Sequence, residues 1–263
     1  MKVGILGVGL LSAGLDGWTK GRAVLAGTSS YRLESVPEPE SPLLPANERR
    51  RSSDAVRWAL HVADEAVRQS GLHAQELATV FASSGGEMAV LDQLCRALTT
   101  PDRALSPTLF HQSVHNTAAG YWGIATGCQQ SSTALSSYDD SSALGLLEAV
   151  AYATVEERPV LFVAYDLPSP PPLARARPIR SAFAAALVMT PSANGAPVYA
   201  DLTLATHTKA EITGMEDHTL EELRRGNPAA RLLPLLRALA QPGSHRASLN
   251  VLDDQRLIVE IES

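Results

Sequence analysis

Hydrophobic and polar positions follow two different patterns along the chain. Up to about residue 190, short runs that are largely apolar alternate with longer stretches whose apolar residues recur every three or four positions. Runs of the first kind are typical of buried strands in a sheet, and stretches of the second kind are typical of amphipathic helices. The predicted strands cover residues 3–8, 77–84, 132–137, 160–166 and 181–191.

Local capping signals mark where helices begin and end. Ser53 is a favoured N-cap residue and precedes a stretch whose apolar residues share one face, and Gly71 then ends the helix. Further helices are predicted over residues 85–98, 113–127 and 140–154.

After Asn194-Gly195 the pattern changes to alternation of apolar and polar residues. Residues 201–206 and 256–261 have the period of two that indicates antiparallel strands with one partly exposed face. Thr219 and Glu222 predict a capping box for a helix between the two strands.

The order of strands and helices predicts an α/β sheet with helices on its faces. Two Pro-rich stretches, residues 36–51 and 167–178, are predicted to be loops because successive prolines block both helix and ladder. We predict a main domain over residues 1–192 and an antiparallel strand and helix extension over residues 193–263, packed on the same domain.

Composition and charge exclude several classes of function. The 263 residues are 45% hydrophobic and 19% charged, as in ordinary globular proteins, and the formal net charge of −6 argues against nucleic acid or an anionic membrane as the main partner. Cys95 and Cys128 have no metal-ligand spacing, so we predict neither a disulfide framework nor a metal or cofactor, as expected in the cytoplasm. The glycine-rich apolar N-terminus predicts a buried strand, not a signal peptide or a dinucleotide fingerprint, and no apolar run has the ~20 residues that cross a bilayer.

The most informative feature is the corner between the strand at 132–137 and the helix that begins near Asp140. A sharp strand-to-helix turn presents a reactive side chain in many enzymes, and the helix N-terminus there stabilises a thiolate or an oxyanion. This corner contains Tyr138, Asp139 and Asp140 and no cysteine. Three interpretations of Asp139 stay open, namely a helix cap or pocket plug, a catalytic acid or base, and a gate for a partner's substrate tunnel.

The chain resembles the β-ketoacyl synthases of the thiolase-like superfamily in SVHNTAAGYWGIATG (113–127) and STALSSYDDSSALGLLEAVAYA (132–153). In that family an Asn-x-Ala-Ala-Gly helix precedes a corner that bears the catalytic cysteine, and Asp139 takes the place of that cysteine here. The resemblance is closest to short ketoacyl-synthase-like proteins of aryl polyene and xanthomonadin-type pigment pathways, which are regarded as chain-length factors. It rests on LPANERRRSSD (44–54), SVHN (113–116) and VAYDLPSPPPL (163–173).

The resemblance implies a thiolase-like fold, with a half-thiolase βαβαβ layer followed by a short antiparallel C-terminal extension. It also implies a chain without synthase activity of its own, because an aspartate cannot form the acyl thioester. Synthases carry two further histidines in glycine-containing contexts, and His207, His218 and His245 lack the following glycine. The implied function is a non-catalytic chain-length factor that pairs with a full-length ketoacyl synthase in aryl polyene or fatty-acid-like polyketide synthesis.

The resemblance also implies where partners and substrate would bind. Strand 131–137 would pair with the synthase across the dimer axis, and a basic loop would steer an acidic acyl carrier protein. The carrier-docking candidates are Arg175, Arg177 and Arg180. The candidates for the lining of the acyl tunnel are Tyr138, Asp139, Tyr121, Trp122, His115 and Asn116.

Two other functions remain open at this stage. The first is a divergent acyltransferase or thioester hydrolase that uses His115 with Asp139 or Ser137. The second is a self-associating homodimer without a pathway role, because an exposed edge at 131–137 could pair with itself.

Overall fold

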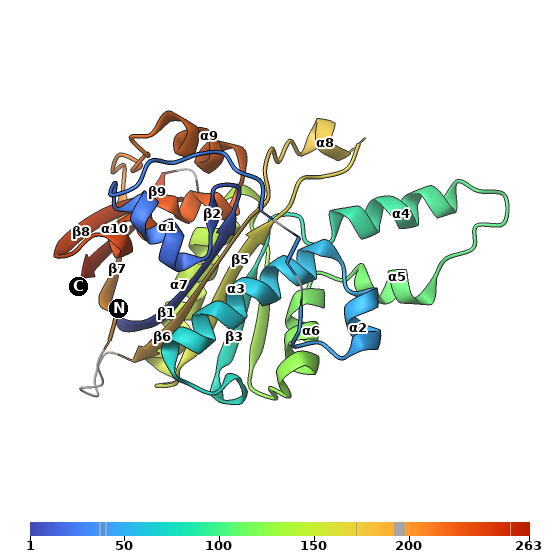
Figure 1. Ribbon diagram of the computed structural model, residues 1–263, viewed down its shortest axis with the longest axis horizontal. Helices are drawn as coiled ribbons and strands as arrows, with labels where there is room; N and C mark the ends of the chain where they lie inside the picture. The colour runs from blue at the N-terminus through green and yellow to red at the C-terminus, as the bar shows by residue number, and fades with distance from the viewer. Residues whose placement is uncertain (37, 40, 172, 192–197, 253) are drawn as a thin grey trace.

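The computed structural model describes residues 1–36, 38–39, 41–171, 173–191, 198–252 and 254–263. Within these residues the strands form one nine-stranded mixed sheet in the order β4-β3-β5-β6-β1-β7-β9-β8, with β2 paired to β1 outside this path (Figure 1). The strands are β1 (Lys2–Ser12), β2 (Leu15–Asp16), β3 (Ala78–Ala82), β4 (Ser132–Leu135), β5 (Val160–Asp166), β6 (Phe183–Pro191), β7 (Ala200–Thr208), β8 (Ser244–Val251) and β9 (Gln255–Glu262).

Helices cover both faces of this sheet, which confirms the predicted α/β class (Figure 1). One face packs against α3 and α6, and the other packs against α7 and α10. The helices are α1 (Trp18–Leu25), α2 (Ala46–Arg51), α3 (Asp54–Ser70), α4 (Met88–Leu98), α5 (Pro107–Gln112), α6 (Thr117–Thr126), α7 (Ser141–Val155), α8 (Leu173–Ala176), α9 (His218–Gly226) and α10 (Leu233–Ala240), with 3₁₀ turns η1 (Ala74–Glu76), η2 (Tyr138–Asp140) and η3 (Ala229–Leu232).

The contact between α3 and β1 explains the glycines of the N-terminal strand. A Cβ atom added at Gly9 would lie 2.0 Å from the carbonyl oxygen of Val62, and one at Gly7 would lie 2.1 Å from that of Ala66. Only glycine therefore lets the backbone of α3 lie so close to the sheet. The predicted caps of α3 are confirmed, since Ser53 accepts the N–H of Val56 at 3.1 Å and Gly71 is left-handed.

Three predictions of local structure are wrong. Residues 46–51, within the predicted loop 36–51, form α2, because the prolines precede this helix and Pro45 is its N-cap residue. Residues 173–176, within the predicted loop 167–178, form the short helix α8.

The third concerns the start of α9. Asp217, not Thr219, is its N-cap, because the Asp217 carboxylate accepts the backbone N–H groups of Thr219 at 2.9 Å and Leu220 at 3.0 Å. Glu221, not Glu222, accepts a backbone N–H in front of the helix, that of Met215 at 2.9 Å. Asp217 lies two residues before the predicted cap and competes with threonine for the same role.

The C-terminal strands extend the same sheet beyond β1. β7 pairs antiparallel with β1, and β9 pairs antiparallel with both β7 and β8. The strands predicted at 201–206 and 256–261 are confirmed as β7 and β9, whereas β8 was not predicted. Asn194-Gly195 and the predicted boundary between residues 192 and 193 lie outside the described residues.

Helices α4 and α5 and the segment that joins them form an arm that projects away from the sheet (Figure 1). Of the residues of α4, only Val90 and Leu94 are buried. Leu91, Leu98 and Phe110 are 42%, 50% and 64% exposed, so the arm presents apolar side chains without a partner in the described part of the chain. Such a surface is characteristic of a region that binds another protein.

Strand β4 forms one edge of the sheet and pairs in parallel with β3. The N–H groups of Thr79 and Ser83 donate to the carbonyl oxygens of Ser131 and Leu135. Because alternate residues of a strand face the same neighbour, the backbone groups of Ser132 and Ala134 point to the outer edge. None of the described helices is long and apolar enough to cross a membrane.

Candidate functional site at the strand-to-helix corner

The corner between β4 and α7 is built as a tight turn. Ser141 fixes it, because its hydroxyl donates to the carbonyl oxygen of Tyr138 at 2.7 Å and accepts the N–H of Ser137 at 2.8 Å. Tyr138 has a φ of +51°, a left-handed conformation that strains a residue with a Cβ. The turn therefore holds Tyr138 and Asp139 in fixed positions on a backbone that costs free energy.

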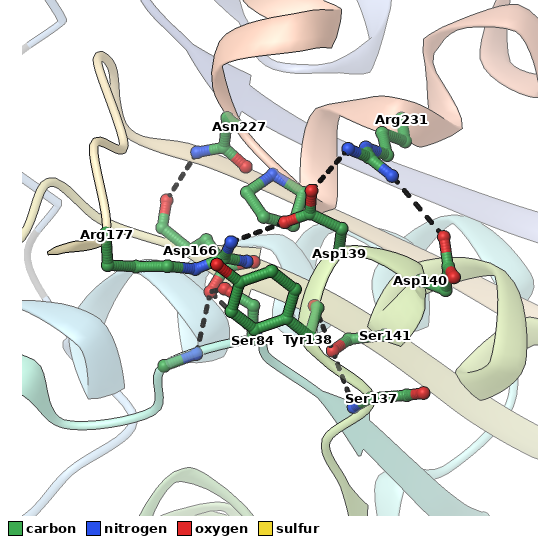
Figure 2. Close-up of polar contacts among 12 residues, drawn as sticks. Ser84, Ser137, Tyr138, Asp139, Asp140, Ser141, Asp166, Arg177, Asn227 and Arg231 are labelled. Atoms are coloured by element: carbon green, nitrogen blue, oxygen red, sulfur yellow. Dashed lines mark hydrogen bonds and ion pairs between the residues drawn. The ribbon is translucent and has the colours of Figure 1, made fainter. Parts of the chain in front are cut away.

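Asp139 does not cap the helix. Its carboxylate accepts a hydrogen bond from Nη1 of Arg177 through Oδ1, and one from Nη2 of Arg231 through Oδ2 at 2.7 Å. Figure 2 shows Asp139 between these two guanidinium groups. The α7 N-cap position is occupied by Asp140, and neither side chain makes a capping bond there. Asp139 is thus the centre of an ion-pair cluster that ties the corner to the α8–β6 loop and to η3.

Asp140 extends this cluster to the C-terminal strands. Its carboxylate accepts from Nη1 of Arg231 at 3.3 Å, from Nδ2 of Asn250 at 2.7 Å and from the N–H of Leu252 at 3.1 Å. Arg231 thereby bridges the two neighbouring aspartates (Figure 2). The corner is joined to segments far away in the sequence through these two carboxylates.

Tyr138 lies over one of the arginines. The guanidinium carbon of Arg177 is 3.8 Å from the centre of the tyrosine ring, a cation–π contact, while the tyrosine itself is 64% exposed. Tyr138, Asp139, Arg177 and Arg231 line a hollow of about 230 Å³, which we call the corner hollow. Its other lining residues are Pro178, Ile179, Arg225, Gly226 and Pro228.

The two other aromatic candidates lie in the core. Trp122 is 1% exposed and packs among the residues between α3 and the sheet. Tyr121 is 5% exposed, and its hydroxyl accepts a hydrogen bond from Nε2 of Gln112 at 2.9 Å. Tyr121 also lines a groove of about 610 Å³ together with His111, at the base of the arm. Neither aromatic ring lies at the corner hollow.

His115 and Asn116 form no hydrogen bond with Asp139 among the described residues. Both ring nitrogens of His115 are buried and have no hydrogen-bond partner in the described part of the chain, and burial lowers the pKa of this imidazole. His115 packs on Gly86, where an added Cβ would lie 3.2 Å from Nδ1. Asn116 is exposed at the N-cap position of α6 without a capping bond.

Two buried carboxylic acids at the loop between β3 and α4 were not predicted. Asp166, at the end of β5, accepts hydrogen bonds from the hydroxyl of Ser83 at 3.0 Å and from the N–H and hydroxyl of Ser84 at 2.9 and 2.8 Å. Burial raises the pKa of Asp166 to about 6. Burial also raises the pKa of Glu87, which accepts from the hydroxyl of Ser53 at 2.8 Å, to about 7. These acids hold the loop between β3 and α4.

The raised pKa of Glu87 predicts a stability that falls with pH. The folded chain keeps the Glu87 proton up to about pH 7, whereas the unfolded chain loses it near pH 4.5, so stability is lost as pH rises between these values. Glu87→Gln keeps the hydrogen bond and removes the titration. Between pH 4.5 and pH 8, the free energy of unfolding of this variant, measured by urea denaturation, should rise by about 3 kcal/mol relative to that of the wild type. The exposed Glu156→Gln is the control, and equal pH profiles for Glu87→Gln and the wild type would contradict the prediction.

The predicted basic loop divides into two parts. Arg175 and Arg180 are exposed, whereas the side chain of Arg177 is only 14% exposed and is bound to Asp139. The arginines that join Arg177 at the corner are Arg225 and Arg231, which sequence analysis missed. Their only signal is the cluster of basic residues in LRRGNPAAR, which by itself indicates a solvated helix end. No three potential metal ligands gather among the described residues.

Comparison with known proteins decides the family. The family described as the β-ketoacyl synthase N-terminal domain matches residues 26–247, which is most of the chain. The chain belongs to this family. The fold is the thiolase-like fold of ketosynthases, as its structural neighbours show. No curated protein matches the chain.

Three similar structures contain ketosynthases with a second protein. The complex of a ketosynthase with its chain length factor from Xenorhabdus doucetiae has a TM-score of 0.74 at 23% identity, covering 98% of this chain and 99% of that chain. The ishigamide ketosynthase/chain length factor has a TM-score of 0.73 at 12% identity, with coverage of 100% and 99%. A type II polyketide synthase acyl carrier protein in complex with its hexaketide-bound ketosynthase has a TM-score of 0.76 at 11% identity, with the same coverage.

Proposed function

We propose that this chain is a non-catalytic, cytoplasmic chain-length factor that pairs with a full-length ketoacyl synthase in aryl polyene or fatty-acid-like polyketide synthesis. The observation that carries the proposal is the state of Asp139, which is bound by Arg177 and Arg231 and which the sequence resemblance aligns with the cysteine of the family. Each oxygen of this carboxylate accepts a hydrogen bond from a guanidinium group, which hinders attack by either oxygen on an acyl thioester. The partner synthase would therefore carry the acyl chain.

The alternative of a lone acyltransferase or hydrolase has no support from the geometry. It would need His115 in contact with Asp139 or Ser137. Neither ring nitrogen of His115 has a hydrogen-bond partner in the described residues, and both carboxylate oxygens of Asp139 are bound by arginines. A base and a nucleophile within hydrogen-bond reach are the first requirement of such an enzyme.

The edge of β4 and the arm support pairing with a second subunit. Among the described residues the outer edge of β4 has backbone groups without a partner, which another strand can extend, and the arm adds exposed apolar side chains such as Leu98 and Phe110. Co-expression with a full-length ketoacyl synthase should yield a complex with one copy of each chain, with synthesis only in the complex. A chain that forms only homodimers, or that turns over acyl thioesters alone, would contradict the proposed function.

Tyr138 is proposed to limit the length of the product. It is held in a strained conformation at the corner next to the β4 edge, where a bound partner would cover its exposed ring. Tyr138→Ala should enlarge the shared tunnel and lengthen the conjugated product, which would shift its absorbance maximum to the red. Val155→Ala, at the far end of α7, is the control. An unchanged absorbance spectrum for Tyr138→Ala would show that Tyr138 does not limit the length of the product.

Carrier-protein steering is proposed for the exposed arginines only. Arg177 is excluded because Asp139 binds it, whereas Arg175 and Arg180, on either side of it in sequence, are exposed. The double variant Arg175→Glu with Arg180→Glu should weaken binding of an acyl carrier protein by about tenfold at low salt, and by less at high salt because ions screen exposed charges. Surface plasmon resonance at two salt concentrations measures this, with exposed Arg246→Glu as control. Equal affinity of the double variant and the wild type would exclude this surface.

A further inference from the structure

Two neighbouring hollows meet at a group of arginines. The corner hollow, of about 230 Å³, adjoins a second hollow of about 260 Å³, and both are lined by Arg225 and Arg231. Arg177 lines the first and Arg224 lines the second, and we call the two together the paired hollow. Four arginines around one space stand out in a chain whose formal net charge is −6.

Several N–H donors of these arginines are not used by the protein. Arg225 is 76% exposed and donates through Nε to Glu221 at 2.8 Å, which leaves both of its terminal nitrogens without an acceptor in the described residues. Arg224 donates to Glu221 through Nε and Nη2, each at 2.7 Å, and its Nη1 has no acceptor among the described residues. Nε and Nη2 of Arg177 are buried without an acceptor among the described residues. Because each guanidinium has five N–H donors, the group retains capacity for a ligand rich in oxygen atoms.

The carboxylates nearby do not cancel this charge. Asp139, Asp140 and Glu221 each form an ion pair with an arginine. The hydrogen bond from Arg224 is the main reason that the pKa of Glu221 is lowered to about 2. Three carboxylates face four arginines, so one positive charge remains. An anion that enters the paired hollow therefore meets net positive charge together with unused donors.

We propose that the paired hollow binds a phosphate group, either as a free phosphate or as a phosphate ester of a larger molecule. The planar fork of arginine matches the spacing of phosphate oxygens. A tetrahedral phosphate also accepts hydrogen bonds from several directions, and Arg225 and Arg231 can approach it from different sides because they line both hollows. Thr213 also lines the second hollow, and its hydroxyl oxygen accepts the N–H of Ser248 at 2.9 Å, which leaves its own hydrogen for a ligand. The site does not depend on the proposed partner function, because the isolated chain contains every residue named.

Isothermal titration calorimetry with pyrophosphate, and separately with coenzyme A as a soluble phosphate ester, tests the site at an ionic strength held constant with sodium chloride. We expect saturable binding of pyrophosphate, weakened at least about tenfold in Arg225→Gln. Asp139→Asn should bind several-fold more tightly, because it removes a negative charge from the lining. Binding of coenzyme A as well would show that the paired hollow accepts phosphate esters. Binding of pyrophosphate alone would show that it accepts only free inorganic phosphates.

Arg68→Gln is the matched control for Arg225→Gln. Arg68 is 72% exposed and pairs with the acid four residues before it, Asp64, just as Arg225 pairs with Glu221, but it lies on α3. The Arg68→Gln variant should bind pyrophosphate like the wild type. Absence of saturable binding to the wild type, or equal losses in the two arginine variants, would overturn the proposal.

Discussion

Asp139→Ala is expected to lower the free energy of unfolding by about 2–3 kcal/mol. The substitution removes the acceptor of Arg177, whose side chain is 14% exposed, and one of the two acceptors of Arg231. A mostly buried guanidinium that loses its counter-charge costs about 3–5 kcal/mol, and the partial exposure of Asp139, at 35%, reduces this figure. Urea denaturation at pH 7.5 measures the change.

The matched control for this prediction is Asp102→Ala in the arm. Asp102 is exposed, and its carboxylate accepts a hydrogen bond from the hydroxyl of Thr100, so its loss should cost less than about 0.5 kcal/mol. If Asp139→Ala were as stable as the control, the two ion pairs of Asp139 would contribute nothing to folding, and the structural account of this residue would be wrong.

Ala134→Pro is expected to abolish the complex with a ketoacyl synthase while the chain itself stays folded. The N–H of Ala134 points to the outer edge of β4, away from β3, so proline removes a donor that only a partner strand could use. Loss of the central pairing of an interface should weaken association by at least about a hundredfold. Size-exclusion chromatography of the co-expressed chains measures the complex.

Thr133→Pro gives the comparison for this second prediction. The backbone of Thr133 faces β3, so proline there should break the internal ladder and lower the stability of the chain. The Ala134→Pro chain should keep the thermal midpoint of the wild type within a few degrees. A stable Ala134→Pro chain that still forms the complex would show that the partner does not bind at the β4 edge.

The main elements of the fold were predictable because their signals are local. The apolar runs of β1, β3, β5 and β6 and the caps Ser53 and Gly71 depend on residues within a few positions of each other. Strand β8 was missed although the apolar Ala247, Leu249 and Val251 alternate in sequence with polar residues, because the polar start of the strand, SHR, hides this period. The cap of α9 was misplaced because two good capping residues lie two positions apart.

The site was predictable only in part, and for a physical reason. The position of Asp139 at a strand-to-helix corner follows from the residues beside it. Its partners do not, because Arg177 and Arg231 are 38 and 92 residues away in sequence, and a long-range ion pair leaves no local pattern. For the same reason the sequence left a helix cap open as one interpretation, since this is a common local role of an aspartate at such a position.

The central claim is that this chain does not hold an acyl group covalently. Mass spectrometry of the intact protein, after incubation with acyl thioesters of coenzyme A and of an acyl carrier protein, tests it most directly. We predict the unmodified mass for the chain alone, and in the complex an adduct only on the synthase subunit. An acyl adduct on the isolated chain, at Asp139 or at any other side chain, would contradict the account.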